Sequence, residues 1–267
     1  MLVKLKFRVL KTIRVMKEKY LAEMRNIWKS FGTVIALRGV DFCVRHNEIV
    51  GLVGDNGAGK STLIKILSGV FPPDKGEIYI NGNKIDIKNY SARKARELGI
   101  ETVFQEKAIA ENQTLWRNVF MGREIRSRFG FLKVKQMKQE TEKLLKRIGL
   151  TSSAISSDLT TAKTLSGGEK QGLAIARALY FKANLIILDE PTIGLSLVET
   201  EKVLEFVGKI KEEGKSCIFI THNIYQVYPV ADRFVILDRG KVVGEYYKKD
   251  LTLEELIEKL RMIAIGG

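Results

Sequence analysis

The chain has 267 residues and a formal net charge of +14, and 45% of its residues are hydrophobic and 28% charged. This length suits one large domain or two modest ones, and the balance of apolar and charged residues is typical of a globular protein. No apolar run approaches the roughly 18 residues of a membrane span, and the N-terminus lacks a secretory signal. The sequence therefore excludes an integral membrane protein, and we expect a cytosolic one.

Part of the positive charge is concentrated at the N-terminus. Residues 1–20 contain seven lysines and arginines and one glutamate, between apolar residues that alternate first and then follow helical spacing. A basic amphipathic element of this kind can lie on an anionic membrane surface or contact RNA. A tail without structure, or a physiological start at Met16 or Met24, explains the same segment, and we favour these two explanations. Residues 1–22 are set apart as a basic N-terminal extension, and residues 23–267 as the folded domain.

The two cysteines, Cys43 and Cys217, lie in strand-like apolar runs. Cysteines in such surroundings in a cytosolic protein behave as small hydrophobic core residues. We therefore expect neither a redox role nor a metal site from them.

A glycine-rich loop is the clearest motif of the sequence. Residues 54–62 read GDNGAGKST and follow the apolar run 49–53, so a buried strand leads directly into the loop. Such a loop turns backbone N–H groups toward a di- or triphosphate, while Lys60 supplies a cation and the Ser61 hydroxyl can ligate Mg²⁺. A helix predicted over Lys60–Ser68 adds the positive end of its dipole. The motif predicts a nucleotide site, and residues 54–62 are called the phosphate loop below.

The residues on either side of the phosphate loop predict strands, turns and a short helix. Gly32 and Gly39 separate the first strands, and Asn81-Gly82 predicts a tight hairpin turn because both residues tolerate positive φ. Helical character is expected over Ser91–Leu98. Strands are expected over Met24–Ile27, Val34–Leu37, Val40–Val44, Ile49–Val53, Glu77–Ile80, Lys84–Ile87 and Ile100–Phe104.

From about residue 106 the sequence becomes helical and charged, with Leu115, Val119, Met137 and Leu144 at helix-compatible spacing. This stretch predicts a separate helical lobe. Further along, Thr252 and Glu255 predict a capping box at the start of a final helix. Between the lobe and that helix, elements are expected over Gly172–Tyr180 (helix), Leu185–Leu188 (strand), Val198–Lys211 (helix), Cys217–Ile220, Phe234–Leu237 and Lys241–Tyr246 (strands).

Two adjacent carboxylates end one of these strands. Asp189 and Glu190 follow the continuous apolar run Leu185–Leu188, which is typical of a strand buried on both faces. At the carboxyl end of such a strand, beside the phosphate loop, Asp189 would hold Mg²⁺ through water. Glu190 would polarise the water that attacks the γ-phosphate, since this transfer depends on positioning and charge stabilisation. The pair predicts hydrolysis of a nucleoside triphosphate.

A third motif completes an ordered set. Residues 165–171 read LSGGEKQ, and they lie well after the phosphate loop and shortly before LIILDEPT at 185–192. In isolation, Ser166 followed by two glycines is a helix N-cap. In this order the three motifs resemble the ATP-binding cassette (ABC) ATPases, over about Met24 to Gly267. The resemblance implies an α/β fold, with a P-loop NTPase core, an antiparallel β subdomain and a helical subdomain over about 106–181.

The resemblance also implies the residues of the site. In the family the LSGGEKQ signature caps the γ-phosphate held by a second subunit, so residues 166–168 are expected to contact ATP in trans. Phe31 matches the aromatic residue that stacks on adenine, Gln105 the glutamine that touches Mg²⁺ and links the lobes, and His222 the switch histidine. The implied cofactors are ATP and Mg²⁺. The expected catalytic residues are Lys60, Glu190 and His222, the metal ligands are Ser61, Gln105 and Asp189, and the nucleotide-binding residues are Phe31, Gly54, Asn56, Gly57, Ala58, Gly59, Lys60, Ser61, Thr62, Ser166, Gly167 and Gly168.

Two positions depart from the pattern of the family. Glu169 stands where the family most often has Gln, and Ser196 stands where it usually has Asp. That Asp braces the two halves of the family's dimer, so an intersubunit contact is left open, and Ser196 can instead cap the helix that follows. Neither change removes a phosphate, metal or water ligand, so we expect hydrolysis to be retained.

Residues 66–73, 102–106 and 118–124 resemble the ATPases of bacterial monosaccharide importers of the ribose, xylose and fructose type. Because the chain carries one phosphate loop and one signature, two copies must meet head to tail as a homodimer. The resemblance implies transmembrane permease subunits as partners, met by the helical lobe near Gln105 to Arg123, and a substrate-binding protein as an indirect one. The chain would then be peripheral, at the cytoplasmic face of the inner membrane.

A soluble ABC ATPase that acts on nucleic acid or ribosomes is the alternative, with the basic extension as its contact. Such proteins usually have two cassettes or a long coiled-coil insertion, and residues 106–180 contain neither. We therefore favour transport and expect no nucleic acid partner.

Overall fold

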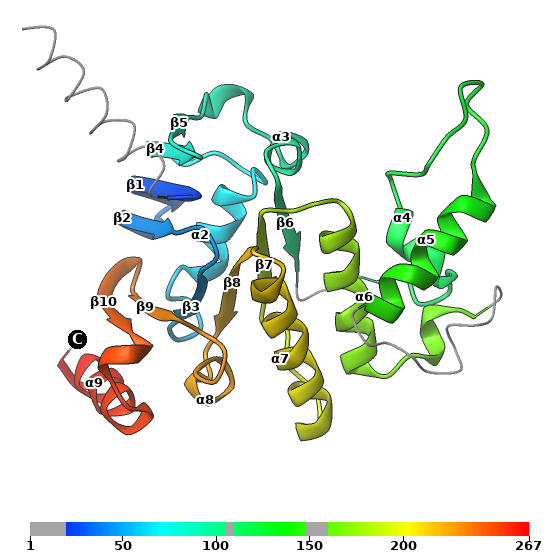
Figure 1. Cartoon of the computed structure of the whole chain (residues 1–267). Coiled ribbons are helices and arrows are strands. Elements are labelled where there is room, and N and C mark those ends of the chain that lie inside the picture. Colours follow the sequence, from blue (N-terminus) through cyan, green and yellow to red (C-terminus); the bar gives the residue numbers. More distant parts are fainter. Residues whose placement is uncertain (1–19, 105–108, 148–159, 267) are drawn as a thin grey trace, which may run out of the picture.

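The computed structural model describes residues 20–104, 109–147 and 160–266 of the chain. Figure 1 shows a body that contains the sheets and a lobe of helices beside it. The strands are β1 (Ala22–Phe31), β2 (Val34–Val44), β3 (Ile49–Val53), β4 (Lys75–Ile80), β5 (Asn83–Lys84), β6 (Ile100–Val103), β7 (Leu185–Asp189), β8 (Ser216–Thr221), β9 (Arg233–Asp238) and β10 (Lys241–Tyr247). The helices are α2 (Lys60–Leu67), α3 (Ala92–Glu97), α4 (Leu115–Phe120), α5 (Val134–Arg147), α6 (Gly167–Tyr180), α7 (Leu197–Glu212), α8 (Ile224–Val227) and α9 (Leu253–Gly266).

A six-stranded sheet in the order β10-β9-β3-β8-β7-β6 forms the centre of the body. Five of its strands run parallel, and β10 pairs with β9 in the antiparallel sense. All residues of β3, β7 and β8 are buried, because both faces of the sheet are covered. The carboxyl ends of β3 and β7 lie at the same edge, so the phosphate loop and the two carboxylates follow strands that end together.

The sheet divides the apolar core into two clusters. Ile186 and Leu188 of β7 pack with the helical lobe and α7, whereas Leu185 and Ile187 pack with α2 and the second sheet. This alternation follows the pleat of the strand, whose successive side chains point to opposite faces. Cys217 is buried in the first cluster, as expected for a small hydrophobic residue.

A second, antiparallel sheet has the order β2-β1-β4-β5. The expected break at Gly39 is wrong, because β2 continues through this residue. Gly39, with φ +75°, lies where the pairing between β1 and β2 shifts register, from Ile27 with Val40 to Trp28 with Arg38. The glycine therefore forms a bulge inside one long strand.

The hairpin of β4 and β5 turns as predicted, with positive φ at both Asn81 and Gly82. The expected strand Lys84–Ile87 is wrong, because β5 ends at Lys84 and a short 3₁₀ helix follows from Ile87 to Asn89. The carboxylate of Asp86 accepts a hydrogen bond from the Lys88 N–H and so favours a turn over the ladder.

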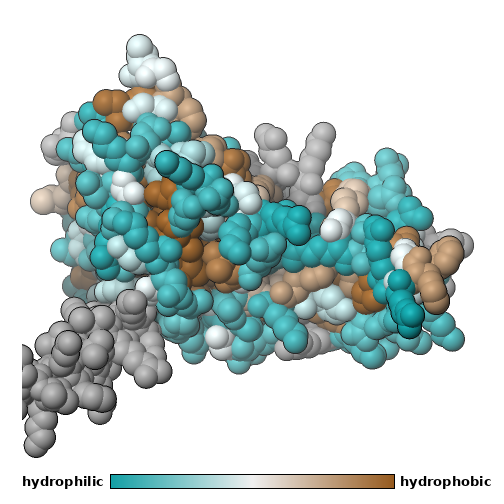
Figure 2. All heavy atoms as spheres, turned by 90° about the horizontal axis from the view of Figure 1, so that it is seen from above, coloured by the Kyte–Doolittle hydropathy of each residue, from teal (hydrophilic) through white to brown (hydrophobic). Residues whose placement is uncertain are grey.

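Helices α4, α5 and α6 form the helical lobe, and Leu115, Val119, Met137 and Leu144 are buried in it as the spacing predicts. Seen from above, apolar side chains gather in the middle of the body and at the end of the lobe, with hydrophilic side chains around them (Figure 2). In the part of the chain that is described, no helix combines the length and the apolar character that a membrane span needs.

Candidate nucleotide site

The phosphate loop connects β3 to α2 and lies against two other segments of backbone. A Cβ atom on Gly54 would lie 2.1 Å from the carbonyl oxygen of Leu237, and one on Gly59 would lie 2.7 Å from that of Ala36. Gly57 has φ +83°, and a Cβ there would meet no atom of the described residues within 4 Å. Gly54 and Gly59 are thus needed for close approach of the backbone, and Gly57 for its conformation.

The Lys60 side chain is hydrogen-bonded to the backbone of the phosphate loop. Its ammonium group donates hydrogen bonds to the carbonyl oxygens of Gly54, at 2.7 Å, and Asp55, at 3.0 Å. Burial lowers the pKa of Lys60, while Glu190 and Asp189 act in the opposite direction. A cation that is desolvated at the base of a glycine-rich loop is suited to receive a phosphate, because the anion offsets the cost of burial. Ser61 and Thr62 follow in the first turn of α2.

Asp189 is the last residue of β7 and is buried at the same edge of the sheet. Within the described residues its Oδ1 atom has no hydrogen-bond partner. Burial raises the pKa of Asp189, and the neighbouring Glu190 carboxylate raises it further. A buried carboxylate oxygen without a donor fits a magnesium ion or its water shell, since hard cations prefer oxygen ligands.

Glu190 and His222, separated by 32 residues in sequence, meet at the ends of neighbouring strands. The Oε1 atom of Glu190 lies 3.1 Å from Nδ1 of His222, just after β8. Glu190 has φ +49°, and its N–H donates to the carbonyl oxygen of Ile220 at 3.1 Å. The Glu190 carboxylate is buried and the imidazole is half exposed. This arrangement positions a proton acceptor beside a group that is open to the surface.

The signature begins helix α6, and its two departures have structural roles. The Ser166 hydroxyl accepts a hydrogen bond from the Glu169 N–H at 3.3 Å, and the Glu169 carboxylate accepts one from the Ser166 N–H at 2.9 Å. Glu169 thus completes a capping box, which starts α6 five residues before the predicted Gly172. Ser196 caps α7 in the same way with Glu199, as predicted.

Gly167 and Gly168 let the start of α6 pack closely on the start of α7. A Cβ on Gly167 would lie 2.5 Å from Cδ2 of Leu195, and one on Gly168 would lie 3.0 Å from the carbonyl oxygen of Glu199. The Glu199 carboxylate also accepts a hydrogen bond from the Gly168 N–H at 3.4 Å. The hydrogen bonds from Ser196 and from these amides lower the pKa of Glu199. The signature is therefore attached to the segment that follows Asp189, the candidate metal ligand, and Glu190, the candidate catalytic residue.

Phe31 and Gln105 are the remaining predicted site residues. Phe31 ends β1 and is half exposed, with its ring edge-on to Phe71 at 5.4 Å between centroids and the Lys29 ammonium 5.5 Å from its centre. Gln105 lies outside the described residues, as do residues 1–19 of the basic extension.

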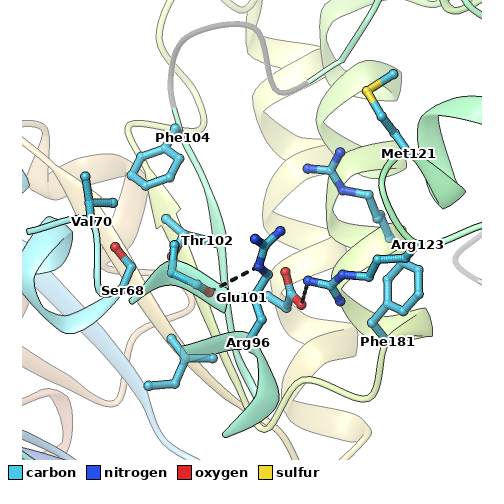
Figure 3. Close-up of a pocket in the computed structure, with 12 residues that line it drawn as sticks. Ser68, Val70, Arg96, Glu101, Thr102, Phe104, Met121, Arg123 and Phe181 are labelled. Atoms are coloured by element: carbon cyan, nitrogen blue, oxygen red, sulfur yellow. Dashed lines mark hydrogen bonds and ion pairs between the residues drawn. The ribbon is translucent and has the colours of Figure 1, made fainter. Parts of the chain in front are cut away.

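A groove between the body and the helical lobe contains a cluster of arginines that the sequence did not reveal. It encloses about 290 Å³, and Figure 3 shows Arg96 and Arg123 approaching it from opposite walls. Arg123 pairs with Glu101, and its guanidinium lies 4.3 Å from the centre of the Phe181 ring. Arg177 also lines the groove, and burial lowers its pKa, as do Arg123 and Arg96 nearby. Only the three-dimensional packing brings these residues together, because they come from α3, β6, the segment after α4 and α6.

Comparison with known proteins agrees with this geometry. Residues 37–193 match the family model described as ABC transporter. The xylose/arabinose import ATP-binding protein XylG of Sulfolobus acidocaldarius is 44% identical over 92% of this chain and 96% of its own length. The ribose import ATP-binding protein RbsA of Clostridium tetani is 41% identical over 91% of this chain and 47% of its own length, so the chain spans about half of that relative.

Solved structures give the same result. A nucleotide-free ATP-binding cassette from an ABC transporter has a TM-score of 0.75 at 25% identity, over 91% of this chain and 95% of that chain. The ATP-binding cassette MJ0796, in a dimeric post-hydrolysis state bound to ADP and Pi, has a TM-score of 0.71 at 26% identity, over 85% of this chain and 98% of that chain.

The fold and site define an ATP-binding cassette, and the chain belongs to the ABC transporter family. It is an ATP-binding, ATP-hydrolysing subunit of that family, as the sequence predicted. Membership of this family decides against the alternative of an ATPase that acts on nucleic acid or ribosomes.

Proposed function

We propose that two copies of this chain form a head-to-tail homodimer that hydrolyses ATP with Mg²⁺ and drives the permease of a monosaccharide importer. The names of the relatives, which import xylose and arabinose or ribose, support the substrate class. The dimeric cassettes among the structural neighbours support the homodimer. A subunit of this kind is peripheral, at the cytoplasmic face of the membrane, and a substrate-binding protein reaches it only through the permease.

The proposed roles follow the geometry of the strand ends. The backbone N–H groups of residues 54–62 and the Lys60 ammonium hold the phosphates, with Phe31 against adenine. Ser61 and Asp189, with Gln105, hold Mg²⁺, which when bound neutralises charge on the phosphate oxygens. Residues 166–168 of the partner subunit close the site.

Glu190 accepts a proton from the attacking water, and His222 holds the carboxylate in place while its exposed face turns toward the γ-phosphate. The observation that carries the proposal is the buried oxygen of Asp189 at the same strand end as this pair, which has no hydrogen-bond partner among the residues that the structure describes. A buried polar atom without a hydrogen bond costs stability, so a folded protein retains one where a bound ligand supplies the missing partner.

We place the permease in the groove between the two lobes. The groove opens beside Val70 and Met121, which are half exposed, and its walls carry Arg96, Arg123 and Arg177. An apolar rim with cationic walls suits a short amphipathic helix that carries a carboxylate. The groove and the signature lie at opposite ends of α6, so a movement of the lobe is transmitted between them by a rigid element.

Complementation between two inactive variants tests the composite site. Lys60→Ala damages the phosphate loop and Ser166→Arg damages the signature, and each variant alone should hydrolyse little ATP. In a mixture, a heterodimer contains one intact site, so about one quarter of the wild-type rate should return after random exchange. If the mixture stays as inactive as its components, the site is not shared between subunits.

Glu190→Gln tests the catalytic assignment. We expect turnover to fall by about 10²–10⁴-fold and an ATP-bound dimer to accumulate in gel filtration, because the amide cannot accept the proton. His46→Gln, an exposed residue in a turn outside the site, is the matched control. Normal hydrolysis by the Glu190 variant would exclude this residue as the proton acceptor.

A further inference from the structure

The connection between α4 and α5 is a short hairpin at the end of the helical lobe, here called the basic hairpin (residues 125–133). Arg126 and Leu132 form an antiparallel bridge, and the Lys133 N–H donates to the Ile125 carbonyl oxygen at 2.8 Å. At its tip, the Ser127 N–H donates to the carbonyl oxygen of Phe131 at 2.7 Å. These contacts fix the conformation of the tip before any partner arrives, so little ordering is needed for binding.

Two aromatic rings project from this tip. The side chains of Phe129 and Phe131 are 80% and 76% exposed, and Gly130 between them has φ +85° and donates its N–H to the carbonyl oxygen of Ser127. Two highly exposed phenylalanines on one ordered turn mark an interaction surface rather than residues that pack in the core. The surface is convex, so a partner with a preformed pocket or a soft apolar phase is needed to cover it.

The sequence on either side of the rings is rich in cations. Residues 123–138 contain six arginines and lysines and one glutamate. Arg126 lies 3.6 Å from that glutamate, Glu124, and the Arg128 guanidinium lies 5.8 Å from the centre of the Phe129 ring. Exposed aromatic side chains flanked in sequence by arginines and lysines are typical of elements that lie in the interface of an anionic bilayer.

We propose that the basic hairpin docks on an anionic lipid surface, with Phe129 and Phe131 at the level of the headgroups and the cations against lipid phosphates. Figure 1 shows the hairpin rising above the lobe, and it begins two residues after Arg123 of the groove. The proximity of the bilayer rests on the proposed function, because a permease in the groove brings the membrane to this side. The hairpin then acts as a second, lipid-directed contact beside the permease.

Sedimentation with vesicles tests the docking surface. The full chain is mixed with phosphatidylcholine vesicles that contain about 30% phosphatidylglycerol, or none, at low and high salt. We expect binding to the anionic vesicles only, and at least a tenfold loss of affinity in Phe129→Ser/Phe131→Ser. Met262→Ser, which removes a 67% exposed apolar side chain on α9, should bind as the wild type does. Equal binding by the double variant and the wild type would overturn the proposal.

A reporter at the tip separates the hairpin from the basic N-terminus. Relative to the wild type, which has Trp28 and Trp116, the tryptophan added in Phe129→Trp should be quenched by brominated lipids, whereas the one added in Met262→Trp should not. Two results would assign the surface to a protein partner instead. One is the absence of quenching at position 129. The other is a double serine variant that binds vesicles normally but binds less tightly to the permease in detergent. ATP hydrolysis and the Lys60/Ser166 complementation are measured without lipid, so their failure would count against the proposed function and not against the hairpin.

Discussion

Replacing Gly59 by alanine should destabilise the protein much more than the same change at Gly57, three residues before Lys60 in the same loop. Both glycines have positive φ, +105° and +83°, so each alanine pays a conformational penalty of about 1–2 kcal/mol. Only at Gly59 would the new Cβ meet other atoms, the Ala36 carbonyl oxygen at 2.7 Å and Leu37 Cδ2 at 2.9 Å. The carbonyl belongs to β2 and cannot rotate away, which adds about 1–3 kcal/mol of overpacking.

Together, these two terms predict that Gly59→Ala lowers the free energy of unfolding by about 2–5 kcal/mol. At about 2–4 °C per kcal/mol, Tm should fall by roughly 2–8 °C in Gly57→Ala and by roughly 4–20 °C in Gly59→Ala. Thermal unfolding followed by circular dichroism, without nucleotide, measures both variants free of any loss of ligand binding. If the two variants lose the same Tm, the close approach of β2 does not explain why glycine is needed at position 59.

Two further predictions concern buried positions. Asp189→Asn should abolish ATP turnover and raise the Tm of the nucleotide-free protein, because it removes a buried carboxylate whose pKa is raised by burial and by Glu190. Because the pKa of Asp189 is raised in the folded state, the wild type loses stability as this carboxyl ionises with rising pH. The difference in Tm between Asp189→Asn and the wild type should therefore grow from about pH 4 to pH 7. A difference in Tm that stays constant over this range would contradict the reasoning. Gly172→Ala should lower the urea midpoint, because its Cβ would lie 2.4 Å from Cε2 of the buried Phe206. Gly208→Ala, whose Cβ would meet no atom within 4 Å in the part of the chain that the structure describes, should raise the midpoint by the equivalent of about 0.5–1 kcal/mol.

Features that depend on neighbours in sequence could be predicted before the structure. The Ser196 cap of α7, the Thr252–Glu255 capping box of α9 and the Asn81-Gly82 turn are all present, because each is completed within four residues. The buried strands were equally clear, since a strand covered on both faces needs an apolar residue at every position.

Predictions that depended on pairing were less successful. Gly39 was expected to end a strand, but β1 pairs with β2 on both sides of it, and the ladder continues past a bulge. The apolar pattern predicts that α6 begins at Gly172, which is too late, because the capping box at Ser166 starts the helix earlier. The apolar pattern reports which residues are buried, not where hydrogen bonding begins.

The sequence by itself determined the family and the phosphate loop and predicted the catalytic side chains that we propose, because these depend on residue types at short, fixed spacings. The tertiary structure decided why Gly54 and Gly59 must be glycine, since the atoms that exclude a side chain come from Leu237 and Ala36. It also decided the contact of Glu190 with His222 and the meeting of three arginines in the groove. These depend on contacts between distant segments, which form only when strands and helices pack and which leave no periodic pattern in the chain.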